Sequence, residues 1–283
     1  MKLPLLLIML AASASLKAAP IVLLNDQFDD GDRSTQNLPT SSRWYYLGGS
    51  GAMSVSDHTL NWNVGGGYAT ALTYFSATPV ALQVGDSLTA SFTLAFDNVG
   101  SVSLADSLRI GIFNSGGARI SADAPAGRFT PSFNNYAGYY GALNPLSSNA
   151  NTFRSYRRGG TAAQDLFTLT SLFLTPSGNG VVFQEDAPLQ VLLEATRTQD
   201  GMLWAISIGD RRIQSTDIGS TYFSFDTLAL YTSGPTNTAQ NFLISNVYVA
   251  MTPAPIPETQ TALLLLLGAG ILIRQRRRST PAV

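Results

Sequence analysis

A strict alternation of apolar and polar residues is the most constraining feature of this chain. From Leu88 to Phe96 the large apolar side chains stand at every second position, with small or hydroxyl-bearing residues between them. Successive side chains of a β-strand point to opposite faces, so this pattern predicts a strand that is buried on one face. Gly85-Asp86, directly before the run, supplies a turn that leads into the strand.

Similar short segments occupy most of the chain between its two ends. Strands are predicted at 43–47, 108–113, 189–198, 202–208, 211–216, 222–231 and 241–250. Asp200-Gly201 and Gly209-Asp210 separate three of these segments as hairpin turns do, which predicts a meander. No convincing helical pattern occurs in the sequence outside the termini. The sequence therefore predicts an all-β fold, an antiparallel β-sandwich of the jelly-roll type.

The segment 19–251 is long enough to form one β-sandwich domain with a core of its own. The sequence has no cysteine, which excludes disulfide bonds and metal sites built on thiolates. Between residues 19 and 257 the sequence has eleven arginines, no lysine and seventeen acidic residues. An acidic domain with scattered arginines argues against nucleic acid as a partner.

Residues 1–18 are typical of a secretory signal peptide. Lys2 precedes an apolar run from Leu3 to Ala12, and small residues follow the run. We expect cleavage after Ala18, and cleavage after Ala14 is the alternative. The other interpretation is an N-terminal membrane anchor, against which the short length of the apolar run argues.

The C-terminal part of the sequence has three consecutive features. Residues 252–258 are a Pro-rich extended spacer, residues 259–273 an apolar helix, and residues 274–283 an Arg-rich tail with Arg274, Arg276, Arg277 and Arg278. The helix would be about 22 Å long, shorter than a hydrocarbon core of about 30 Å, so we expect a marginal single transmembrane helix. The arginines are expected to remain cytoplasmic, which places the domain outside.

This tail resembles the PEP-CTERM sorting signal of Gram-negative bacteria. The matching residues are Pro257 and Glu258, the apolar run and the arginine cluster, whereas Thr259 stands where the family motif has a second proline. The resemblance implies processing by an exosortase-type membrane protease. It further implies export across the inner membrane, transient anchoring there, and a final location at the cell surface or outside the cell. A sortase signal and an unprocessed single-pass anchor are the alternatives.

Residues suited to catalysis are scarce. His58 is the single histidine of the sequence, and we expect it at a turn or on the surface rather than beside a nucleophile. Glycoside hydrolysis needs two carboxylates at a fixed separation. Glu185 and Asp186 are adjacent and would point to opposite faces of a strand, and Glu194 is expected on a solvated outer face. The sequence therefore predicts a protein that is not an enzyme.

The densest group of acidic residues lies near the mature N-terminus. Asp26, Asp29, Asp30 and Asp32 could supply the carboxylate oxygens that calcium prefers, and a calcium there would pin the loop rather than take part in chemistry. The alternative is a turn rich in Asx residues before a strand. Structural calcium is thus the one cofactor that the sequence suggests.

Aromatic residues cluster between positions 133 and 158. The apolar face of a sugar ring stacks on an aromatic ring, while nearby polar groups recognise its hydroxyls. We interpret residues 114–165 as long, weakly regular connections at one end of the sandwich, where binding residues often lie. The predicted ligand-binding residues are Asn135, Tyr136, Tyr139, Tyr140 and Tyr156. The alternative is that these aromatic side chains pack in the core or cover its ends, as we expect for Trp44 and Trp204.

The order of the segments also resembles that of concanavalin A-like, laminin-G-like jelly-roll domains. An Asp-rich stretch at 28–33, a Trp-bearing strand at 43–47, the strands at 88–96 and 107–113, and a final strand at 241–251 carry this resemblance. Together with the sorting signal, it implies an exported, non-catalytic surface or extracellular-matrix protein. The alternative function is a carbohydrate-binding module that recognises extracellular polysaccharide.

Overall fold

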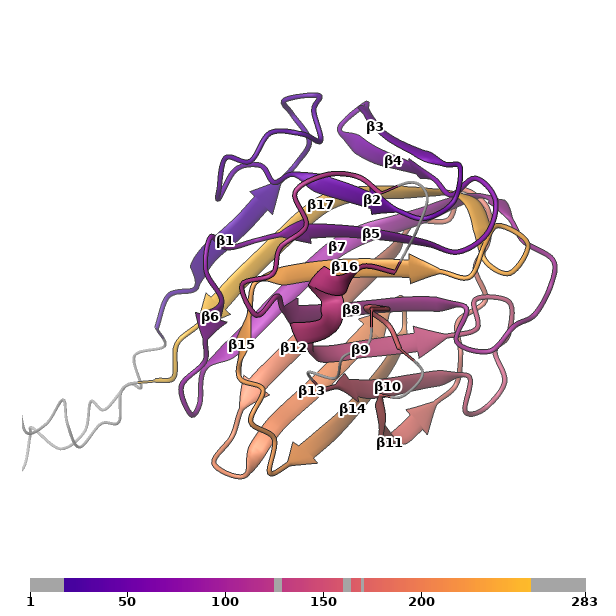
Figure 1. Ribbon diagram of the computed structural model, residues 1–283. Coiled ribbons are helices and arrows are strands. Elements are labelled where there is room, and N and C mark those ends of the chain that lie inside the picture. Colours follow the sequence, from indigo (N-terminus) through magenta and orange to yellow (C-terminus); the bar gives the residue numbers. More distant parts are fainter. Residues whose placement is uncertain (1–17, 125–128, 160–163, 169–170, 256–283) are drawn as a thin grey trace, which may run out of the picture.

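The computed structural model describes residues 18–124, 129–159, 164–168 and 171–255 (Figure 1). Two antiparallel sheets pack face to face and form a β-sandwich, which confirms the predicted all-β class and jelly-roll arrangement. Among these residues, no helix is long and apolar enough to cross a membrane. The expected signal peptide, the sorting motif at 257–259, the transmembrane helix at 259–273 and the four tail arginines lie outside them, apart from Ala18.

The larger sheet has eight strands. In spatial order they are β14 (Arg211–Ile218), β13 (Gly201–Ile208), β12 (Leu189–Arg197), β7 (Ser87–Val99), β17 (Ala239–Thr252), β4 (Thr59–Asn63) and β3 (Ala52–Ser56), and β1 (Ile21–Asp26) pairs with the second half of β17. The consecutive pairing of β12, β13 and β14 confirms the meander predicted from its two glycine-containing turns.

The second sheet has seven strands. In spatial order they are β11 (Leu172–Gly178), β10 (Phe153–Arg158), β9 (Ala137–Leu143), β8 (Leu108–Asn114), β16 (Thr227–Thr232), β5 (Ala69–Tyr74) and β2 (Trp44–Leu47). A short ribbon of β6 (Val80–Ala81) and β15 (Ser224–Phe225) and the 3₁₀-helix η1 (Pro131–Asn135) complete the described elements.

The interpretation of residues 114–165 as weakly regular connections was wrong in part. Strands β9 and β10 and the helix η1 lie there, and β9 and β10 are paired with each other inside the seven-stranded sheet. All seven residues of β9 are buried. A strand that is covered on both faces has no polar side to alternate with an apolar one, so its sequence lacks the period of two.

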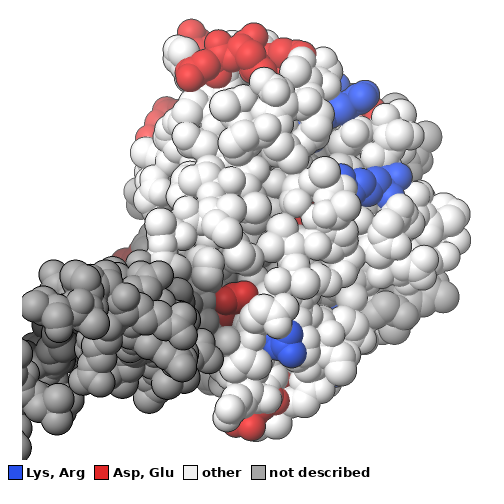
Figure 2. Space-filling view, turned by 90° about the vertical axis from the view of Figure 1, so that its left-hand side faces the viewer, with Lys and Arg blue, Asp and Glu red and all other residues white. Residues whose placement is uncertain are grey.

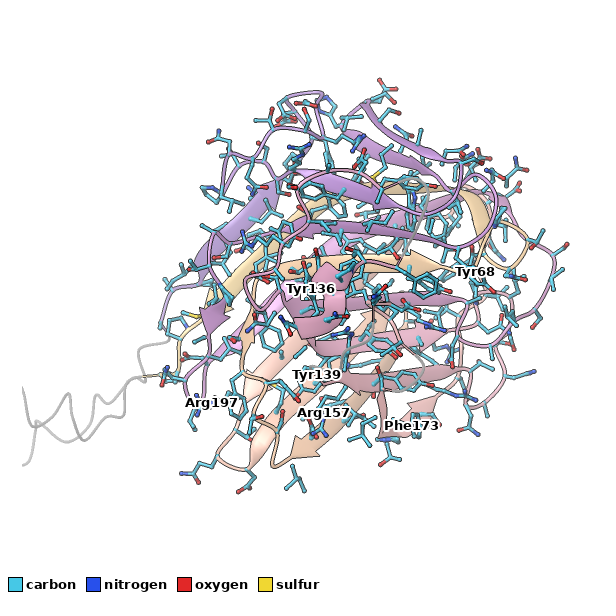
Figure 3. The ribbon with its side chains drawn as sticks, viewed as in Figure 1. Tyr68, Tyr136, Tyr139, Arg157, Phe173 and Arg197 are labelled. Carbon is cyan, nitrogen blue, oxygen red and sulfur yellow. The ribbon has the colours of Figure 1, made fainter. Side chains whose placement is uncertain are left out.

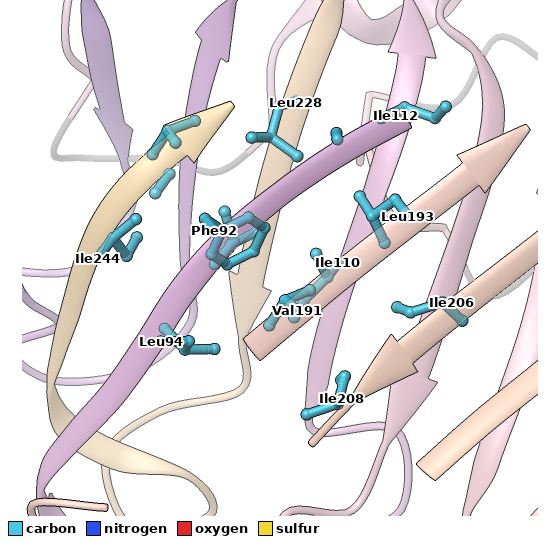
Figure 4. Close-up of a cluster of buried hydrophobic side chains, with 14 of the residues drawn as sticks. Phe92, Leu94, Ile110, Ile112, Val191, Leu193, Ile206, Ile208, Leu228 and Ile244 are labelled. Atoms are coloured by element: carbon cyan, nitrogen blue, oxygen red, sulfur yellow. The ribbon is translucent and has the colours of Figure 1, made fainter. Parts of the chain in front are cut away.

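The main core lies between the two sheets (Figure 4). Leu88, Ala90, Phe92, Leu94 and Phe96 of β7 all point into it, as their alternation predicts. They meet inward-facing residues of the seven-stranded sheet, such as Ile110 and Ile112 of β8. Burying each large apolar side chain contributes about 1.5–3 kcal/mol to folding, so this face of β7 is a major source of stability.

A second, smaller apolar cluster covers the outer face of the seven-stranded sheet. Ile120, Phe133, Leu166 and Phe167 come from the segments 115–124, 129–136 and 164–168, which connect the strands. They pack on strand residues that point away from the main core, including Tyr140 and Tyr231. The side chains in the middle of this face are therefore buried, whereas Tyr68 and Phe173 at its margins are exposed to solvent.

The chain enters and leaves the domain at one corner. Ile21 at the start of β1 is paired with Met251 near the end of β17 (Figure 1). The carboxylate of Asp86, in the turn before β7, accepts a hydrogen bond from the backbone N–H of Ala254 at 2.7 Å. Both ends of the described domain are therefore held side by side.

Candidate functional site

Three of the five predicted ligand-binding residues are buried inside the protein. Tyr136, Tyr139 and Tyr140 are at most 2% exposed. Their burial raises the pKa of each phenol, so all three hydroxyls stay protonated. Asn135 is exposed at the end of η1, and Tyr156 is half-buried on β10. The five residues therefore form no common exposed patch, and the expectation of one is corrected.

Tyr139 belongs to the space between the sheets. Its ring stacks on that of Trp204 at 5.8 Å, and its hydroxyl donates a hydrogen bond to the carboxylate of Asp217 at 2.8 Å. Arg157 donates to the same carboxylate at 2.8 Å. Figure 3 labels Tyr139 and Arg157. A buried tyrosine that hydrogen-bonds a buried carboxylate has a structural role. This agrees with the alternative stated for the aromatic cluster, that its side chains pack in the core.

Tyr140 lies on the other face of β9, and Tyr156 lies beside it on β10. Their rings stack at 5.1 Å, and Tyr156 makes an edge contact at 5.6 Å with Phe173 of β11. Exposure rises along this row because β11 is the outermost strand: Tyr140 is 2% exposed and Phe173 is 42% exposed. The edge of the sheet thus presents an aromatic surface to solvent.

A surface hollow of about 320 Å³ adjoins this aromatic surface. It is lined by Asn151, Arg154, Tyr156, Phe173 and Ser177. Arg154 donates through Nε to the carbonyl of Asn151 at 2.9 Å, and the hydroxyl of Ser177 donates to the Asn151 side chain. Its volume falls at the lower end of the range of small-molecule sites. A guanidinium, an amide and a hydroxyl therefore stand around two aromatic rings.

Asp106 positions two of the residues that line the hollow, Tyr156 and Arg154. Its carboxylate accepts hydrogen bonds from the Tyr156 hydroxyl at 3.1 Å and from Arg154 at 3.4 Å. Burial, together with the nearby charge of Asp106, raises the pKa of Tyr156, so its phenol is a neutral donor. Two of the lining side chains are thus fixed in place before any ligand arrives, which lowers the entropy cost of binding.

The chemistry of the hollow fits recognition better than catalysis. Its lining residues supply apolar ring surface, donors and acceptors, and the carboxylate of Asp106 beside them is engaged by two partners. Glu194 lies elsewhere, on the eight-stranded sheet, in an ion pair with Arg212. His58 is exposed, and its Nδ1 lies 2.9 Å from a carboxylate oxygen of Asp29. These residues occupy the surface positions expected from the sequence.

The four aspartates near the N-terminus line a separate hollow of about 590 Å³ in the loop after β1. Figure 2 shows the acidic surface at the top of the molecule. Asp26 is 1% exposed, and its carboxylate accepts hydrogen bonds from the N–H groups of Phe28 and Ser42 at 3.0 and 3.1 Å. Burial raises its pKa despite these bonds.

Asp32 in the same loop is bound by its own neighbours. Hydrogen bonds from Ser34 and Thr35 lower its pKa to about 2. Among the residues that the structure describes, no group of three or more His, Asp or Glu side chains is placed to hold a metal ion. The loop therefore has the geometry of the alternative, an Asx-rich turn. Structural calcium at Asp26, Asp29, Asp30 and Asp32 stays a prediction from the sequence, and the hydrogen bonds within the loop favour the alternative.

A comparison with protein-family models found no match, and a comparison with curated proteins found none either. Solved structures do match. The carbohydrate recognition domain of Emp46p in its metal-free form is 12% identical, covers 83% of this chain and 97% of that chain, and has a TM-score of 0.51. A point mutant of that domain is 12% identical, covers 85% and 100%, and has a TM-score of 0.52. These neighbours have the legume-lectin-like, concanavalin A-like jelly roll, so the expected architecture is confirmed.

Sequence reasoning identified one residue of the hollow, Tyr156, and missed the other four. Phe173 was the detectable one, because the run Leu172-Phe173-Leu174 before Thr175-Pro176 is consistent with an edge strand. Asn151, Arg154 and Ser177 carry no sequence signal of their own. They meet at the hollow because β10 and β11 are paired and bring the residues near 151 and 177 together.

Proposed function

We propose that this chain is an exported, non-catalytic protein that binds extracellular polysaccharide. The single observation that carries this proposal is the exposed aromatic surface of Tyr156 and Phe173 beside Arg154, Asn151 and Ser177. Aromatic rings offer apolar faces on which the C–H face of a pyranose stacks, and the three polar side chains can exchange hydrogen bonds with its hydroxyls. The same set of groups has no acid–base pair with which to break a glycosidic bond.

The shape of the site narrows the class of glycan. A shallow hollow at a sheet edge accepts a segment of a chain, because neighbouring sugar units can leave it on both sides. Sugars with mostly equatorial hydroxyls present their C–H groups on both flat faces, which suits stacking on Tyr156 and Phe173. We therefore favour β-linked glucose-type polysaccharides. The fold similarity to carbohydrate recognition domains supports this as an analogy of fold, and the site itself carries the argument.

The route to the surface is the second part of the proposal. The predicted signal peptide and sorting motif would export the domain, anchor it transiently through the C-terminal helix, and present Pro257, Glu258 and Thr259 to an exosortase-type protease. The pairing of Ile21 with Met251 supports it, because both ends leave the domain at one corner. Phe173 is labelled away from β1 in Figure 3, so the aromatic surface would stay accessible while the tail is held.

Binding is tested with the full-length chain, purified in detergent and applied to a glycan array that includes β-linked glucans. We expect saturable binding by the natural chain and a loss of about tenfold, roughly 1.4 kcal/mol, for Phe173→Ala. Leu172→Ala is the matched control. It lies next to Phe173 on β11, is 50% exposed, and points to the opposite face of the strand.

Two outcomes would contradict the proposal. One is the absence of binding to every glycan by a correctly folded natural chain. The other is equal weakening of binding by Phe173→Ala and Leu172→Ala, which would place the contact elsewhere on β11. Thermal unfolding of each variant shows whether the fold is preserved, and we expect little change because both side chains are exposed.

A further inference from the structure

Six aromatic rings form one continuous row of contacts across the outer face of the seven-stranded sheet. Tyr68 stacks on Tyr231 at 6.3 Å, and Tyr231 contacts Phe167 at 5.8 Å. Phe167 meets Tyr140 edge-on at 5.3 Å, and the row continues through Tyr156 to the last ring, that of Phe173. The rings come from β10, β11, β9, β16 and two connecting segments, so the tertiary fold alone assembles this row.

The two ends of the row differ from its middle in exposure. Tyr68 is 50% exposed and Phe173 is 42% exposed, whereas Tyr231, Phe167 and Tyr140 are at most 2% exposed. An aromatic ring that is partly open to solvent offers an apolar face on which a sugar ring can stack. Each end ring rests against a tyrosine of the sheet, so it is held in a defined orientation.

The distance between the two ends follows from the sheet. Tyr68 directly precedes β5, and Phe173 belongs to β11, five strands away in the order β5, β16, β8, β9, β10 and β11. At about 4.8 Å per strand, the two residues are about 24 Å apart across the sheet. Figure 3 labels both on the side of the molecule away from β1.

Asp106 connects the supports of the two ends. Its carboxylate binds the Tyr156 hydroxyl and Arg154, and its backbone carbonyl accepts a hydrogen bond from Nε of Arg109 at 2.9 Å. The guanidinium of Arg109 lies 4.7 Å from the centre of the Tyr231 ring, on which Tyr68 is stacked. The supports of the two exposed rings are thus connected by a shared set of contacts around Asp106 and Arg109.

We infer that Tyr68 is a second sugar-stacking platform, and that the chain binds an extended polysaccharide segment that reaches from Phe173 to Tyr68. This inference rests on the proposed function, since it adds a subsite to the same glycan-binding face. Two platforms at a fixed separation favour an internal segment of a long, stiff chain over a free end or a short oligosaccharide. Binding of the second platform is then intramolecular, so affinity rises once the ligand is long enough to reach it.

The probe is a series of cello-oligosaccharides, from the disaccharide to the octasaccharide, titrated calorimetrically into the full-length chain in detergent. We expect affinity to rise by about tenfold once the oligosaccharide spans both rings. Tyr68→Ala is expected to abolish this rise and to leave the short oligosaccharides unaffected. Phe173→Ala is expected to weaken every member of the series.

Controls separate a lost platform from a damaged fold. Tyr68→Phe keeps the ring and is expected to bind as the natural chain does. Ile218→Ala removes another exposed apolar side chain, 77% exposed on the eight-stranded sheet, and is expected to change nothing. Thermal unfolding of Tyr68→Ala reports whether the support of Tyr231 is intact.

The outcomes distinguish the two proposals. Binding that is independent of length and unaffected by Tyr68→Ala overturns the second platform and leaves the hollow at Phe173 standing. Equal weakening of short and long oligosaccharides by Tyr68→Ala also overturns it, since a remote platform cannot act on a ligand that does not reach it. Failure of the natural chain to bind any member of the series, or any glycan on the array, overturns the proposed function itself.

Discussion

The carboxylate of Asp106 and the hydroxyl of Tyr156 form a hydrogen bond of 3.1 Å beneath the aromatic surface of the candidate site. Asp106 has a positive φ of 53°, a conformation that few residues other than glycine, asparagine and aspartate adopt readily. The bond turns a half-buried tyrosine into a fixed support for the exposed ring of Phe173. Asp106, in a left-handed turn, therefore positions a surface that it does not itself line.

Asp106→Asn is expected to weaken glycan binding. Asparagine tolerates the backbone conformation and keeps an acceptor for Tyr156, but it removes the charge that Arg154 meets. A loss of about 1 kcal/mol is expected, close to a fivefold rise in Kd. Titration with the best-binding glycan measures the change. A large fall in Tm with no effect on Kd would contradict the positioning role.

Tyr139→Phe is expected to destabilise the protein and leave glycan binding unchanged. The substitution removes the hydrogen bond to Asp217 and leaves a buried carboxylate with one donor fewer, at a cost of about 1–3 kcal/mol. Thermal unfolding should show a lower Tm, by about 2–4 °C for each kcal/mol. Tyr248→Phe, at a half-buried position of β17, is the control. A loss of glycan binding at unchanged Tm would restore Tyr139 as a ligand residue.

The Arg33–Asp123 ion pair is expected to make stability depend on acid pH. Burial by itself would raise the pKa of Asp123, but the hydrogen bonds from Arg33 and from the N–H of Tyr46 outweigh it and lower the pKa below its ordinary 3.8. Because the pKa is lower in the folded state, the charged carboxylate stabilises the fold at pH values above its ordinary pKa. This contribution disappears as the pH falls through the folded-state pKa.

Asp123→Asn therefore should lower Tm at neutral pH and converge with the natural chain at strongly acid pH. The pair is partly exposed, so the difference is expected to stay below about 1 kcal/mol. Melting curves across the acid range measure it. A difference between the two proteins that persists unchanged at the lowest pH would show that the charge of Asp123 is not its cause.

Removal of calcium is expected to leave the melting temperature unchanged. Asp26 is satisfied by the N–H groups of Phe28 and Ser42, and Asp32 by Ser34 and Thr35, so the loop is held by its own hydrogen bonds. Melting curves with a chelator and with added calcium test this. A rise in Tm with calcium that is absent in Asp30→Asn would instead place a structural calcium at this loop.

Deletion of residues 259–283 is expected to release the folded domain from the membrane. The described strands end at Thr252, before the deleted part, so the deletion removes none of them. Fractionation of cells into membrane and medium, followed by intact mass, measures the location and the last residue. Retention of the truncated chain in the membrane would contradict the predicted anchor.

The sequence alone determined those elements whose two faces differ. The alternation of β7, from Leu88 to Phe96, and the turns at Gly201 and Gly209 predicted strands and a meander because one face of each strand is buried in the core and the other is less completely covered. In such a strand apolar and polar residues alternate with a period of two, so the sequence predicts it. The all-β class followed from many such segments.

Only the tertiary structure decided which aromatic side chains of the cluster are buried and which are exposed. Tyr139 and Tyr140 are adjacent, yet one packs against Trp204 between the sheets and the other lies beneath Phe167 on the outer face. Phe173 remains exposed because β11 ends the sheet. The sequence records that these positions are aromatic, whereas burial depends on which distant segment covers each face, and that is set by long-range packing rather than by local pattern.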